Sequence, residues 1–136
     1  MSDAGLVIDT SALAAIIFGE ADAERYADVL VRHVGACTIS APTLVEVEIV
    51  TRARLGDDGA ELLTTVLQRV SATVEPFDER LAHAAAAAWV RFGKGRHPAQ
   101  LNLGDCYSYA LSRQLEVPLL FKGNDFAQTD VRSAMG

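Results

Sequence analysis

Short apolar runs alternate along this chain with longer segments in which apolar residues recur every three or four positions. The short runs predict β-strands at residues 5–9, 37–40, 73–76 and 117–121. The periodic segments predict helices at residues 23–34, 42–55, 60–70 and 79–92, and a last long helix that follows Gly104. Because strands that alternate with helices pair in parallel, the pattern predicts an α/β fold in which helices cover both faces of a parallel central sheet.

Length and composition indicate a single globular domain over residues 1–136. Half of the residues (50%) are hydrophobic and 22% are charged, which is typical of a folded domain. No apolar run approaches the roughly 20 residues of a membrane helix, and the first residues lack the basic segment of a signal peptide. We therefore expect a cytoplasmic protein that does not bind membranes. Cys37 and Cys106 lie inside apolar segments and are expected to be buried thiols.

The distribution of charge leaves the question of nucleic-acid binding open. A net charge of −6 argues against it, because contacts with phosphates need Lys and Arg. Positive charge is nevertheless concentrated in one segment, where Arg91, Lys94 and Arg96 are followed by His97. These cations could stabilise the C-terminus of the helix at 79–92, or they could hold the phosphates of a bound polyanion.

Acidic residues occur where predicted strands end and where predicted helices begin. Asp9 ends the first strand, Asp105 falls in the first turn of the last helix, and Asp125 follows the strand at 117–121. Glu46 lies early in the helix at 42–55, whereas Glu48 is expected to be solvated. Taken singly, each acid could simply start a helix or form a turn. Ligands of open parallel sheets, however, bind outside the carboxyl ends of the strands.

Taken together, these acids predict a cation site. Carboxylates gathered at one edge of a sheet repel one another in a partly desolvated cleft, and a cation relieves that repulsion. Oxygen ligands without a neighbouring His or Cys favour Mg²⁺ or Mn²⁺ over zinc. Because such an ion can deliver water as a nucleophile, the pattern predicts phosphoryl chemistry on a polyanion.

With this pattern the sequence resembles the PIN-domain ribonucleases, and among them the VapC toxins of bacterial VapBC toxin–antitoxin pairs. The segments that carry the resemblance are VIDTSAL at 7–13, TLVEVEIVTRARLG at 43–56, GKGRHPAQLNLGDCYSYALS at 93–112 and PLLFKGNDFAQTDV at 118–131. The resemblance implies the PIN fold and an endoribonuclease that inhibits translation and growth. It also implies a VapB antitoxin as partner and a homodimer. The helices at 23–34 and at 42–70 are plausible dimer or antitoxin surfaces, although their apolar faces could equally belong to the core.

The resemblance also assigns roles to residues. It implies that Asp9, Glu46, Asp105 and Asp125 bind one or two Mg²⁺ or Mn²⁺ ions, with Asp9 and Asp105 as the surest ligands. Ser11 would hydrogen-bond within the site, or it could instead cap the next helix. Independently of the resemblance, the concentration of positive charge makes Arg91, Lys94 and Arg96 candidates to hold flanking phosphates of the RNA.

One segment departs from the family pattern. Many relatives carry the last acid in a Thr-x-Asp context, whereas here Asp125 follows Lys122-Gly123-Asn124 and Asp130 lies five residues further on. Asp125 is favoured because it is closer to the end of the strand.

Other classes of protein fit the same acids less well. A phospho-receiver signalling domain needs adjacent acids after the first strand, and a haloacid-dehalogenase phosphatase needs a second Asp at position 11, which is Ser11. A PIN-like module that binds RNA or an antitoxin without cleaving would differ only in its lack of metal-dependent cleavage.

Overall fold

The computed structural model describes residues 5–136. Its strands are β1 (Leu6–Ile8), β2 (Cys37–Ser40), β3 (Thr73–Glu75) and β4 (Leu119–Leu120). Its helices are α1 (Thr10–Ile17), α2 (Ala23–Arg32), α3 (Ala41–Leu55), α4 (Asp57–Arg69), α5 (Glu79–Phe92) and α6 (Leu103–Leu115), with a short 3₁₀ helix, η2 (Phe126–Gln128), after β4.

The four strands form one parallel sheet in the order β3-β2-β1-β4. β1 lies inside the sheet, where Leu6 is opposite Cys37 of β2 and Val7 is opposite Leu119 of β4. Because the strands run in the same direction, their carboxyl ends meet at one edge. The structure therefore confirms the predicted parallel sheet and brings the residues that follow β1 and β4 to neighbouring positions.

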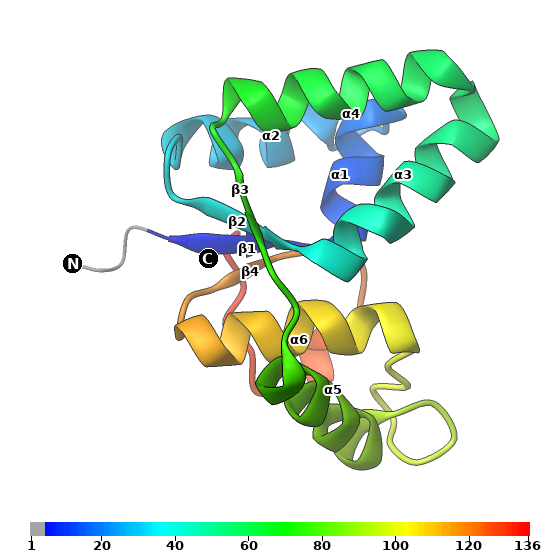
Figure 1. Ribbon diagram of the computed structural model, residues 1–136, viewed down its shortest axis with the longest axis vertical. Coiled ribbons are helices and arrows are strands. Elements are labelled where there is room, and N and C mark those ends of the chain that lie inside the picture. The colour runs from blue at the N-terminus through cyan, green and yellow to red at the C-terminus, as the bar shows by residue number, and fades with distance from the viewer. Residues whose placement is uncertain (1–4) are drawn as a thin grey trace.

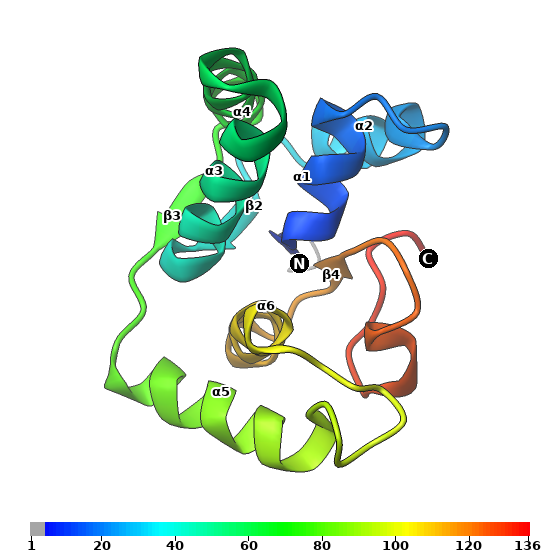
Figure 2. The same ribbon diagram turned by 90° about the vertical axis from the view of Figure 1, so that its right-hand side faces the viewer.

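The sheet separates two hydrophobic cores. Figures 1 and 2 show α1–α4 on one side of the sheet and α5 and α6 on the other. Because successive side chains of a strand point to opposite faces, Leu6 and Ile8 pack with the first group of helices and Val7 packs with the second. Each such buried side chain contributes about 1.5–3 kcal/mol. These contacts fix β1, and with it the residue that follows.

Two elements differ most from the pattern-based prediction. The run at 117–121 forms a strand of only two residues, because Pro118 has no N–H to donate and the chain turns away at Gly123, whose φ is +105°. α1 has no counterpart among the predicted ranges, because its sequence TSALAAII is apolar on nearly every side and shows no helical period.

Other predictions of local structure are confirmed. The helix at 79–92 has the predicted bounds. The helix predicted at 60–70 begins earlier, at Asp57, and the last helix begins at Leu103, so that Gly104 lies inside it and does not precede it. Both cysteines are buried free thiols. Among residues 5–136, no helix is long and apolar enough to span a bilayer.

Candidate active site

Asp9 lies at the carboxyl end of β1 and is only 3% exposed. It is the N-cap of α1, and its Oδ2 accepts the backbone N–H of Ser11 at 3.0 Å and the Ser11 hydroxyl at 2.6 Å. Its Oδ1 accepts the hydroxyl of Ser108, on α6, at 2.6 Å. These donors compensate the burial of a carboxylate and fix its direction. An apolar strand can end on an acid here because neighbouring elements supply hydrogen bonds.

Ser11 connects Asp9 to the loop that follows β4. Besides donating to Asp9, the Ser11 hydroxyl accepts the backbone N–H of Lys122 at 2.9 Å. The alternative in which Ser11 caps the following helix is wrong, because Asp9 is the cap and Ser11 is already inside α1.

Asp105 lies in the first turn of α6 and forms a capping box with Asn102. Its Oδ2 accepts the backbone N–H of Asn102 at 3.0 Å, and the Asn102 side chain accepts the N–H of Asp105 at 2.8 Å. Burial, together with the neighbouring carboxylates of Asp9 and Asp125, raises the pKa of the Asp105 carboxyl to about 7, although the hydrogen bond from the Asn102 N–H lowers it. The carboxyls of three elements are therefore close enough to interact electrostatically.

Glu46, on α3, faces the same group of residues. Its Oε1 accepts the hydroxyl of Thr10, the neighbour of Asp9, at 2.6 Å. Its carboxylate lies against Gly104, where a Cβ would overlap both of its oxygens. The neighbouring Glu48 is exposed, as the sequence predicts. Glycine at position 104 thus makes room for an acid beside Asp105.

The structure separates the two acids after β4. Asp125 is close enough to raise the pKa of the Asp105 carboxyl. Asp130 instead accepts the hydroxyl of Tyr109 at 2.6 Å and pairs with Arg91 at 3.5 Å and with Arg113 at 3.8 Å. Asp125 is therefore the acid that joins the other three.

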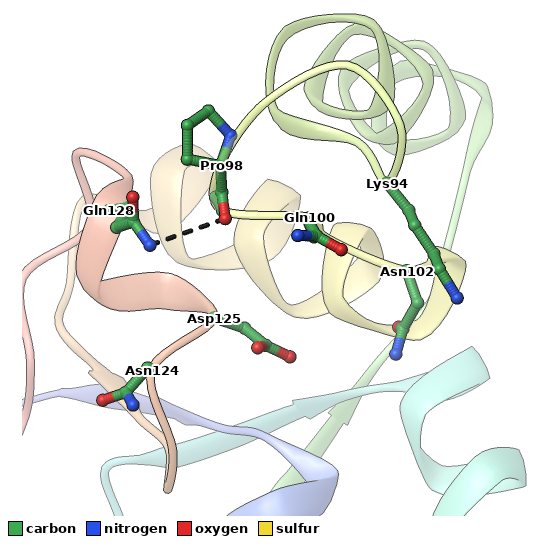
Figure 3. A pocket seen from close by; sticks show the side chains of 8 residues that line it. Lys94, Pro98, Gln100, Asn102, Asn124, Asp125 and Gln128 are labelled. Carbon is green, nitrogen blue, oxygen red and sulfur yellow. Dashed lines mark hydrogen bonds between the residues drawn. The ribbon is translucent and has the colours of Figure 1, made fainter.

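A polar cleft of about 370 Å³ adjoins Asp125, the only one of the four acids that lines it. Figure 3 shows the Asp125 side chain pointing into it from the segment around η2, with Asn102 and Lys94 on the opposite side. The cleft is lined by Lys94, Pro98, Ala99, Gln100, Asn102, Asn124, Asp125 and Gln128.

The three basic candidates differ in their surroundings. Lys94 lines the cleft. Arg96 is exposed on the same loop but is not part of the cleft lining. Arg91 pairs with Asp130 and lies over the ring of Phe92, 4.6 Å from its centroid.

The four acids offer only carboxylate oxygens as possible ligands for a cation. Within residues 5–136, no three His, Cys, Asp or Glu side chains converge into a preformed metal-binding group. In the same range, none of Asp9, Glu46, Asp105 and Asp125 forms an ion pair with Lys, Arg or His. Hard oxygen donors whose charge the protein leaves uncompensated suit an ion such as Mg²⁺, which is bound through few carboxylates and several waters.

Comparison with known proteins identifies the family of this chain. A model of the PIN domain matches residues 6–132. The chain belongs to the PIN-domain family. A Ribonuclease VapC from Mycolicibacterium smegmatis is 46% identical to this PIN-domain protein over 130 residues, which cover 93% of this chain and 97% of the relative. Ribonuclease VapC30 from Mycobacterium tuberculosis is 43% identical over 127 residues, covering 93% and 95%. The chain is a VapC-type PIN domain.

Solved structures agree with this fold. Mycobacterium tuberculosis VapC20, described as a toxin that cleaves the sarcin-ricin loop, superposes with a TM-score of 0.77 at 19% identity, covering 93% of this chain and 96% of that one. A chain of a toxin–antitoxin complex from Klebsiella pneumoniae gives a TM-score of 0.63 at 16% identity, with 93% of each chain covered. The PIN fold predicted from the sequence is confirmed.

Sequence reasoning missed the neutral residues that organise the acids. Ser108 was not selected, although it lies three residues after Asp105 and therefore on the same side of its helix. Thr10 directly follows Asp9 and was not connected with Glu46. Pairings between residues 36 and 99 positions apart, as in these two hydrogen bonds, follow from the fold and leave no local signal.

Proposed function

We propose that this protein is the toxin of a type II toxin–antitoxin pair and acts as an endoribonuclease that depends on Mg²⁺ or Mn²⁺. The observation that carries the proposal is the uncompensated cluster of acids at the carboxyl edge of the sheet, within a chain whose relatives are named ribonucleases. Cleavage of RNA would inhibit translation and growth. The site of action would be the cytoplasm, where translation takes place.

Asp9, Asp105 and Asp125 would hold the cation, directly or through water, with one or two ions bound. When bound there, the ion would supply an acidified water as nucleophile and neutralise charge that develops on the phosphate. Glu46 would complete the set of ligands or accept a proton from the attacking water. Ser11 and Ser108 would keep the Asp9 carboxylate in a fixed orientation, because both of their hydroxyls donate to it.

The RNA backbone would enter through the polar cleft beside Asp125. Lys94 is the basic residue best placed to hold a phosphate, because it lines this cleft. Arg96, on the same loop, would contact a phosphate further along the chain. Arg91 would contribute less, since Asp130 already pairs with its guanidinium.

A VapB-type antitoxin would neutralise the toxin, and one structural relative comes from a toxin–antitoxin complex. Expression of the protein in a bacterium without its antitoxin tests the function. We expect growth arrest from the native protein, no arrest from Asp105→Asn at the same level of folded protein, and recovery when the antitoxin is co-expressed. Equal toxicity of the two proteins would contradict the proposed role of the acids.

The homodimer would form through an apolar surface that α3, α5 and α6 share. Val45, Ile49, Val90 and Leu103 on this surface are each more than half exposed. The surface also contains a groove of about 860 Å³, lined in part by Trp89. Protruding side chains next to a groove give one patch both halves of a self-complementary contact, as a two-fold interface requires.

The mass of the protein in solution tests this interface. We expect Ile49→Glu to convert a dimer to a monomer in light scattering. Val31→Glu is the matched control, because Val31 is equally exposed on α2, outside the proposed interface. A dimer that survives the change at Ile49 but is lost with the change at Val31 would assign the interface to α2 instead.

A further inference from the structure

Lys122 makes a contact that the chemistry described so far does not use. Its Nζ lies 2.5 Å from Oε1 of Glu20 and 3.0 Å from Oδ1 of Asp22. Both acids belong to the turn between α1 and α2, about a hundred residues away in the sequence. The three side chains are only 29–37% exposed, so solvent screens this contact less than it screens a surface ion pair.

The contact leaves the lysine unavailable to a phosphate. Two carboxylates already surround the ammonium group, and the three side chains together carry a net charge of −1. An RNA phosphate would therefore be repelled by the group as a whole. The cation is in place to join two parts of the protein rather than to bind substrate.

The loop that Lys122 begins carries Asp125. Directly after Asp125 in the sequence, Phe126 is buried and packs against Phe121, with ring centroids 5.1 Å apart. Before Asp125 in the sequence, Lys122 is held at two points. Its side chain pairs with the turn after α1, and its backbone N–H donates to the Ser11 hydroxyl. Within residues 5–136, the Asp125 carboxyl has only the Asp105 carboxyl as a side-chain hydrogen-bond partner. Whether the two carboxyls meet therefore depends on the two anchors that hold the loop of Asp125.

We propose that Lys122 is a positioning residue for Asp125, acting through its ion pairs with Glu20 and Asp22. The proposal rests on the proposed function, because it assumes that Asp125 belongs to the cation site. Without the lysine, the loop loses its anchor on the α1–α2 turn, and two like charges are left side by side. The carboxylate of Asp125 then no longer stays beside Asp105, and the site loses a ligand.

Binding of Mn²⁺ alone to the metal-free full chain tests the proposal, with calorimetry as readout. We expect Lys122→Met to weaken Mn²⁺ binding about tenfold, within the range typical for residues that support metal ligands. Lys122→Arg, which keeps the charge, should restore most of the affinity. In the Asp125→Asn background, Lys122→Met should have no further effect, because the residue through which it acts is already altered.

Arg52→Met is the matched control, because Arg52 forms an exposed ion pair with Asp57 at 2.7 Å on the α3–α4 corner. It should leave Mn²⁺ affinity unchanged. Native affinity in Lys122→Met, or an equal loss in both backgrounds, would overturn the proposal. Should Lys122→Met fail to fold, a variant that also carries Glu20→Gln and Asp22→Asn avoids the repulsion and is expected to show the same loss. If Asp9→Asn and Asp105→Asn leave Mn²⁺ binding intact, the proposed function itself fails.

Discussion

The raised pKa of the Asp105 carboxyl allows the cluster of acids to be tested without an RNA substrate. The pKa of this group in the folded protein is raised to about 7, mainly by burial and also by Asp9 and Asp125, against 3.8 for the ordinary group. The folded protein therefore retains a proton that the unfolded chain releases above pH 4. As a result, the free energy of unfolding falls as the pH rises from 4 to 7, by about 1.4 kcal/mol per pH unit from this group.

Asp105→Asn removes this dependence. An asparagine carbonyl can still accept the N–H of Asn102, so the capping box is retained. In EDTA, we expect the stability of the variant relative to the native protein to increase by about 2.5 kcal/mol between pH 5 and pH 8, and to level off above pH 7. Urea unfolding at several pH values, followed by fluorescence of the single tryptophan, Trp89, measures this difference.

Two results would refute this reasoning. One is a stability difference between the two proteins that does not change with pH, which would mean that Asp105 is not held protonated by its surroundings. The other is a variant that loses stability more strongly at high pH than the native protein. Saturating Mn²⁺ is the control: it should stabilise the native protein most at high pH, where the site is fully ionised.

Two of the remaining predictions compare a residue of the proposed site with a neighbouring residue of similar chemistry outside it. Glu46→Gln should lower RNA cleavage at least tenfold, whereas Glu48→Gln should not, because only Glu46 faces the other acids; equal rates for the two variants would remove Glu46 from the site. Asp125→Asn should lower Mn²⁺ affinity with little loss of stability. Asp130→Asn should instead leave Mn²⁺ affinity unchanged and lower the free energy of unfolding by about 1–2 kcal/mol, because its tyrosine and arginine contacts are weakened. The opposite pattern in calorimetry and urea unfolding would exchange the roles of the two acids. Lys94→Gln should weaken RNA binding and reduce its salt slope by about one, and an unchanged slope in a salt titration would place Lys94 outside the contact.

The sequence predicted the sheet and its four acids because these depend on local patterns. Buried strands of a parallel sheet appear as short apolar runs, and an acid at the end of such a run is conspicuous, as with Asp9. The bounds of α5 followed from its amphipathic period, whereas α4 begins at Asp57, before its predicted start at residue 60. α1 was missed because its sequence is apolar on nearly every side, so that no period marks it.

The sequence could not show how the acids are held. The hydrogen bonds of Ser108 and Thr10, and the room that Gly104 leaves for Glu46, join elements that are distant in the chain. Such pairings depend on packing between helices. The choice between Asp125 and Asp130 also needed the structure, because it depends on which acid the arginines already engage.

Cleavage of total bacterial RNA by the purified, antitoxin-free protein tests the central claim most directly. The reaction would be run with Mn²⁺, with EDTA, and with Asp105→Asn in parallel. We predict discrete RNA fragments from the native protein with Mn²⁺, and intact RNA both in EDTA and with the variant. Cleavage that persists in EDTA or in Asp105→Asn would contradict a metal-dependent site built on these acids. Intact RNA from a folded protein that binds Mn²⁺ would contradict the proposed cleavage of RNA in this mixture and favour a PIN-like module that binds without cleaving.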